Sequence, residues 1–166
     1  FFLKDRAPTE CNTLYRPDAF PISDYSHSVR LIKNMLDGQP GCLRINSGFV
    51  DVRDVAELHL LAMTDPAAKG ERFLAIAGES MWMADVATVL CKQLGAQASK
   101  VSTQVIPDDV VLKNPAMVNG LVSLLGVDMN ATSAKAMQLL GWMPRSREAS
   151  IVACAESLIR LGFVDH

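Results

Sequence analysis

The sequence predicts an α/β fold in which short strands alternate with amphipathic helices. The clearest observation is the stretch from Gly48 to Met63, where a strand-like apolar pattern changes at Asp51 into a helical pattern without a loop. A second is the apolar run at 73–77, bounded by charged residues and glycine, which is typical of a strand covered on both faces in a parallel sheet. Hydrophobic residues make up 49% of the 166 residues, which favours one domain with its own core.

Apolar spacing, capping residues and glycine or proline stops define the expected elements in order. The first half contains a helix opened by Asp24 or Ser26 and ended by Gly38, one or two strands within 43–50, a helix from Asp51 to Met63, the strand at 73–77, and a helix opened by Ser80 and ended by Gly95. The second half contains a strand at 101–106, a helix opened by Asn114-Pro115, a helix capped by Asn130 or Thr132 and ended by Gly141, and a last helix from Ser146 to Gly162. Residues 1–23 are expected to form an irregular leader.

Three charged residues at the start of the central helix could be structural or functional. Asp51 is expected to cap the first free N–H groups, and Asp54 adds negative charge near the positive end of the helix dipole. Arg53 opposes that dipole and so needs a partner, and an ion pair with Glu57 or with a neighbouring carboxylate is favoured over a functional role. Because capping already explains both carboxylates, catalysis is the minor interpretation for this cluster.

Composition and charge argue against several functional classes. The formal net charge is -2 and no basic stripe occurs, so a nucleic-acid partner is not expected. No apolar run approaches the roughly 20 residues that cross a membrane, and charge appears too early for a signal peptide, so we expect a cytoplasmic protein without a membrane partner. The four cysteines and three histidines lack ligand spacing, so we expect free thiols and no metal site.

Four stretches in matching order resemble the extended short-chain dehydrogenase/reductase family, in its dihydroflavonol reductase and aldehyde reductase branch. They are F-V-D-V-R-D-V-A at 49–56, G-E-R-F-L-A-I-A-G-E at 70–79, S-A-K-A at 133–136 continuing to L-G-W-M-P-R at 140–145, and A-E-S-L-I-R-L-G at 155–162. The resemblance implies that residues 24–166 are the C-terminal part of a Rossmann-type sheet with a mainly helical substrate-binding lobe. Within it, Trp142 is expected to act as a structural plug whose indole N–H seeks a backbone carbonyl.

Two motifs of that family do not occur in the sequence. No glycines have the spacing, the preceding strand and the following helix of its phosphate-binding turn. Its proton-donating tyrosine is followed four residues later by lysine, whereas neither Tyr15 nor Tyr25 has a lysine at that distance. We therefore expect no catalytic and no cofactor-binding residue here, and NAD or NADP only in a longer parent of which this chain would be a fragment.

The resemblance implies the substrate-binding portion of an NAD(P)-dependent reductase of aldehydes or ketones, inactive when isolated. Two alternatives stay open, a sugar-nucleotide epimerase or dehydratase and a non-catalytic binding or assembly module. Exposed sheet edges and an uncovered apolar face also predict self-association. The helix opened by Asn114-Pro115 carries a wide apolar stripe that could line a substrate pocket or pack as core. The candidate substrate contacts are Met117, Leu121, Leu124 and Leu125.

Overall fold

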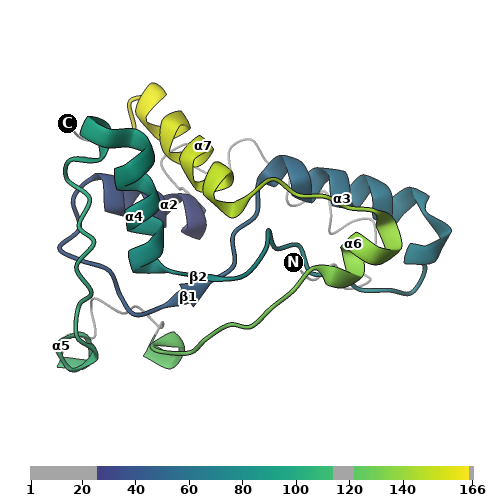
Figure 1. The fold of residues 1–166 in the computed structure, drawn as a ribbon, viewed down its shortest axis with the longest axis horizontal. Helices are drawn as coiled ribbons and strands as arrows, with labels where there is room; N and C mark the ends of the chain where they lie inside the picture. The colour runs from purple at the N-terminus through teal and green to yellow at the C-terminus, as the bar shows by residue number, and fades with distance from the viewer. Residues whose placement is uncertain (1–25, 114–121, 165–166) are drawn as a thin grey trace, which may run out of the picture. The chain divides into compact units, whose positions relative to one another are not determined.

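A computed structural model describes residues 26–113 and 122–164 (Figure 1). The chain divides into residues 1–31, of which only 26–31 are described, and residues 32–166. The elements, in order, are α2 (His27–Leu36), β1 (Asn46–Ser47), α3 (Val52–Thr64), η2 (Pro66–Ala68), β2 (Met81–Trp82), α4 (Met83–Leu94), η3 (Gly95–Ala98), α5 (Asp108–Lys113), η5 (Val122–Leu124), α6 (Ala134–Leu140) and α7 (Arg147–Arg160).

Helix α2 begins after Ser26, whose carbonyl accepts from the Arg30 N–H at 2.9 Å. The other candidate cap, Asp24, lies outside the described residues. The helix ends at Leu36, close to the expected stop, and Gly38 follows with a φ of 90°. That left-handed conformation is one that glycine adopts without steric cost, so the sequence-based stop is confirmed.

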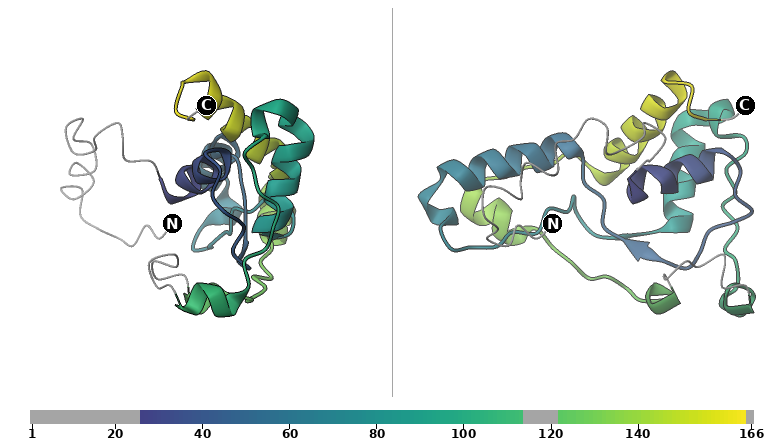
Figure 2. Two further views of the ribbon diagram at one scale, coloured as in Figure 1. Left: turned by 90° about the vertical axis from the view of Figure 1, so that its left-hand side faces the viewer. Right: turned by 180° about the vertical axis from the view of Figure 1, so that it is seen from behind.

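Two groups of helices each bury a set of apolar side chains. In one, α4 and α7 lie side by side, and α4 buries an apolar face that includes Val86, Ala87 and Leu90 (Figure 1). In the other, called the α3 group, α3 packs against α6 and η2, and the right-hand view of Figure 2 shows α3 beside α6. The second group closes over a core of Leu58, Ala68, Ala136, Leu140 and Trp142.

The sheet is smaller than the sequence predicts, although the α/β class is confirmed. Strands β1 and β2 pair antiparallel, with Asn46 opposite Trp82. The expected strand at 101–106 is reduced to a single parallel bridge between Val105 and Cys42. Within 43–50, only residues 46–47 form a strand.

The prediction of a strand at 73–77, covered on both faces, is wrong for the described structure. Leu74 is 60% exposed. The Ala77 N–H donates to the Phe49 carbonyl at 2.8 Å, but the Ile76 N–H donates to the Ser133 hydroxyl instead of to a second backbone segment. A strand requires a ladder of backbone partners, and isolated bonds of this kind do not form one.

Side-chain caps were predicted with mixed success. Ser146 accepts from the Ala149 N–H at 3.1 Å and opens α7, as expected, and Gly141 ends α6 in the left-handed region. At the start of α6 the cap position is Ser133, without a side-chain cap bond, and not Asn130 or Thr132, although Thr132 accepts from the Ala134 N–H. Ser80 does not cap α4, because Trp82 occupies that position without a side-chain bond. The sequence missed α5. The start of the helix expected from Asn114-Pro115 lies outside the described residues, and its expected end is the short 3-10 helix η5 followed by a bridge at Leu125, not an α-helix.

None of the helices within residues 26–113 and 122–164 has the length and apolar character needed to cross a bilayer.

Candidate functional site

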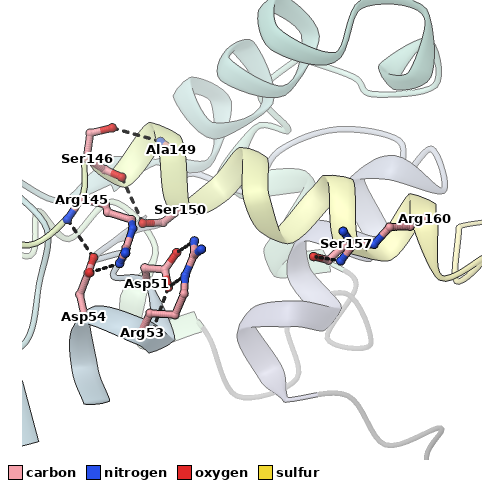
Figure 3. Close-up of polar contacts among 9 residues, drawn as sticks. All are labelled: Asp51, Arg53, Asp54, Arg145, Ser146, Ala149, Ser150, Ser157 and Arg160. Carbon is pink, nitrogen blue, oxygen red and sulfur yellow. Dashed lines mark hydrogen bonds and ion pairs between the residues drawn. The ribbon is translucent and has the colours of Figure 1, made fainter. Parts of the chain in front are cut away.

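Asp51 forms the start of α3 together with Arg53 (Figure 3). Its Oδ1 accepts from the Arg53 backbone N–H at 2.8 Å and from Arg53 Nε at 2.8 Å, while Oδ2 accepts from Nη2 at 2.6 Å. Arg53 therefore pairs with the neighbouring carboxylate and not with Glu57, the other partner considered. The expected cap is confirmed, and the charge that opposes the helix dipole is neutralised by the capping residue itself.

These hydrogen bonds also determine what Asp51 can do chemically. The hydrogen bond from the Arg53 guanidinium is the largest cause that lowers the pKa of Asp51 from 3.8 to about 2. A carboxyl with so low a pKa is ionised at neutral pH and has no proton to donate. The geometry thus favours a structural role for Asp51, with Arg53 as its fixed counter-charge.

Asp54 makes a long-range contact in addition to its place at the start of α3. Its Oδ2 accepts from the Arg145 backbone N–H at 2.8 Å, and its Oδ1 pairs with Arg145 Nη1 (Figure 3). Its backbone carbonyl accepts from Trp142 Nε1 at 2.8 Å, so the expected role of Trp142 as a plug is confirmed. The interpretation of Asp54 as a second helix-start charge is incomplete, because one buried residue joins α3 to the segment that links α6 and α7.

Sequence reasoning did not identify Arg145 as part of this cluster. The available signal was its place in L-G-W-M-P-R, three residues after Trp142. Trp142 and Arg145 both bind Asp54 of α3. Trp142 donates to the backbone carbonyl of Asp54, and Arg145 donates to its side-chain carboxylate. Asp51, Arg53, Asp54 and Arg145 form a structural junction whose polar groups satisfy one another.

We expect Asp51→Asn to remove a pH-dependent part of the stability. Asparagine caps helices as well as aspartate, so the substitution isolates the charge. Because the folded-state pKa of about 2 lies below the ordinary 3.8, the stabilisation is complete above the higher value and is lost as the pH falls through the lower one. Urea unfolding at neutral pH should give a loss of about 1 to 2 kcal/mol in the variant. A difference between the two proteins that stays constant down to the lower pKa would contradict this assignment.

The candidate substrate contacts are only partly within the described structure. Met117 and Leu121 lie outside it. Leu124 ends η5 and Leu125 follows, and both side chains are half-buried. Leu125 forms an antiparallel bridge with the buried Ile45, directly before β1. The structure therefore brings two of the four candidates next to the small sheet.

Two glycines among the described residues are tightly packed against neighbouring side chains. A Cβ added to Gly41 would lie 2.8 Å from Ile106 Cγ1, and one added to Gly48 would lie 2.9 Å from Ile76 Cγ1. These two glycines are therefore required by close packing and not by the approach of a pyrophosphate. No group of three or more histidine, cysteine or acidic side chains in the described ranges could hold a metal ion. Cys42, Cys91 and Cys154 are free thiols.

Comparison with solved structures shows the fold to which these elements belong. The chain matches gox2253 with a TM-score of 0.66 at 18% identity, over 84% of this chain and 46% of that one. It matches the yeast methylglyoxal/isovaleraldehyde reductase Gre2, complexed with NADPH, with a TM-score of 0.59 at 20% identity, over 80% and 40%. This chain has the fold of part of an extended short-chain dehydrogenase/reductase.

A third structure agrees with this assignment. Gre2 from Candida albicans, in complex with NADPH, gives a TM-score of 0.60 at 22% identity, over 82% of this chain and 37% of that one. The chain thus spans less than half the length of the solved structures it matches. The expected resemblance in fold to part of a protein of this family is confirmed. No family model matches the sequence, and no curated protein matches it.

Proposed function

We propose that the chain is the substrate-binding portion of an NAD(P)-dependent reductase that acts on an aldehyde or a ketone. The observation that carries the proposal is the match to NADPH-complexed reductases over most of this chain and less than half of theirs. The dinucleotide and the proton donor would then belong to the remainder of the enzyme, and this chain would be inactive when isolated. Its own residues would bind and orient the carbonyl substrate.

The exposed apolar surface of the α3 group supports the proposal that the rest of the enzyme docks there. On α3, Val52, Leu60 and Met63 are 78%, 64% and 81% exposed. Among the described residues, no acceptor pairs with the backbone N–H groups of residues 73–75. An extended segment with free backbone groups beside an exposed apolar helix is suited to sheet extension by another polypeptide. The expected self-association depends on this same surface.

The substrate class is tested by the response of Leu124 and Leu125 to added ligands. In the purified chain with labelled leucine methyl groups, NMR titration with isovaleraldehyde should shift the signals of these two residues. The exposed Leu60 and Leu161 serve as controls within the molecule. A parallel assay of NADPH oxidation with the same aldehyde should show no turnover.

Each alternative has its own result in this experiment. Shifts at Leu124 and Leu125 with UDP-glucose but not with isovaleraldehyde would favour the epimerase or dehydratase. The absence of a response to either ligand would favour a non-catalytic binding module. Oxidation of NADPH by the chain alone would contradict the inactive, substrate-binding portion proposed here.

A further inference from the structure

Residues 107–124 are attached at both ends to one short segment, residues 42–45. At the first attachment, the Cys42 N–H donates to the Gln104 carbonyl at 2.7 Å and the Ile106 N–H donates to the Cys42 carbonyl at 2.9 Å. At the second, the Gly126 N–H donates to the Arg44 carbonyl at 2.7 Å, next to the bridge between Ile45 and Leu125. Both ends of this stretch, which includes three of the four candidate substrate contacts and is followed directly by the fourth, Leu125, are thus attached to residues 42–45.

Arg44 contacts both ends of that stretch. Its carbonyl binds Gly126, and its guanidinium binds the carboxylate of Asp108, the first residue of α5, through Nε at 3.1 Å and through Nη2. The hydrogen bonds between the two side chains raise the pKa of Arg44 and lower the pKa of Asp108. Arg44 therefore connects the beginning of the stretch, at Asp108, with Gly126 just after its end.

Gly126 makes room for this arrangement. Its φ is 71°, and an added Cβ would lie 2.7 Å from Arg44 Cζ and 2.8 Å from Nη1. The guanidinium therefore lies against the backbone of Gly126 while it binds Asp108. An ordinary exposed ion pair contributes little because both side chains move freely in water. Here Gly126 limits the freedom of the Arg44 side chain, because its backbone lies against one side of the guanidinium.

We infer that Arg44 is a positioning residue that fixes Leu124 and Leu125 by holding both flanks of the stretch together. The inference depends on the proposed function, because Leu124 and Leu125 are its substrate contacts. Arg44 reaches them through Gly126 and Ile45 and need not touch the substrate. A change at Arg44 would alter the apolar surface offered to the substrate, and so the choice among carbonyl compounds.

Backbone hydrogen exchange tests the positioning directly in this chain. Arg44→Gln should accelerate exchange at the Gly126 N–H by about fivefold, as expected for loss of a local contact in a folded protein. The exchanged pair Arg44→Asp with Asp108→Arg should restore slow exchange, because the opposite charges still meet. The matched control is Lys113→Ala, which removes the exposed pair with Asp109 on the same helix and should leave Gly126 unchanged.

Failure of this inference can be distinguished from failure of the proposed function. If Arg44→Gln leaves both Gly126 exchange and the isovaleraldehyde response unchanged, Arg44 is only a surface ion pair and the inference is overturned. If exchange rises and the response to isovaleraldehyde weakens, the inference is supported. If exchange rises but the parent chain does not respond to isovaleraldehyde at all, the proposed function fails and the specificity role of Arg44 fails with it. Slow exchange at Leu90, a fully buried residue within α4, in every variant would show that the fold is intact.

Discussion

Replacing Trp142 with alanine is expected to lower the free energy of unfolding by about 4 kcal/mol. Trp142 is fully buried in the core of the α3 group, where it packs among Leu58, Ala136 and Leu140. The substitution removes the largest of the fully buried side chains and leaves a cavity between α3 and α6. It also leaves the Asp54 carbonyl without the indole N–H that it accepts at 2.8 Å.

Urea unfolding followed by circular dichroism measures this effect. Trp142→Phe keeps most of the volume and removes the hydrogen bond, so we expect a smaller loss of about 1 to 2 kcal/mol. The neighbouring Met143→Ala is the matched control, since that side chain is exposed, and it should change the free energy of unfolding by less than about 0.5 kcal/mol. A loss below about 1 kcal/mol in Trp142→Ala would mean that this side chain does not hold the α3 group together.

Features that depend on a few neighbouring residues could be predicted from the sequence. The Asp51 cap, the left-handed Gly141 and the Ser146 cap of α7 were all anticipated correctly. In each, the interacting groups lie within three residues of one another or concern a single backbone conformation. Local spacing contains the information that determines such features.

The distant partners of two carboxylates could not be predicted. Asp54 and Arg145 are separated by 91 positions, and Arg44 and Asp108 by 64. Both acidic residues stand at helix starts, where the helix dipole alone is a sufficient explanation of an acidic side chain. The helix dipole already explained Asp54, and Asp108 opens a helix that the sequence did not predict, so neither arginine partner was sought.

The misassigned strand at 73–77 illustrates the same limit. Its apolar run satisfies the pattern of a buried strand, but strand formation depends on a partner with a free backbone edge. One edge meets the Ser133 hydroxyl, whose single O–H is shared between the carbonyls of Leu74 and Ile76 and whose oxygen accepts from the Ile76 N–H. A serine side chain in place of a strand has no signature in the apolar pattern.

For the Asp54 and Arg145 pair, we expect removal of the exposed partner to be the more damaging change. Asp54 has a side-chain exposure of 2% and Arg145 of 46%. Arg145→Ala leaves a buried carboxylate without its counter-charge, and we expect a loss of about 3 kcal/mol in the free energy of unfolding. Asp54→Asn leaves a guanidinium that water can reach and an amide oxygen that can still accept from the Arg145 N–H, so we expect about 1.5 kcal/mol.

Urea unfolding of both variants measures this asymmetry, with Lys135→Ala as the control. Lys135 pairs with Glu71, and both side chains of that pair are more than 40% exposed, so its loss should cost less than about 1 kcal/mol. The order of the three losses in the free energy of unfolding is the decisive result. It depends on which charge remains buried and not on how many ion pairs are broken. An Asp54→Asn variant less stable than Arg145→Ala would show that the carboxylate is solvated once its partner is gone, and that the junction is held mainly by the bond to the Arg145 backbone.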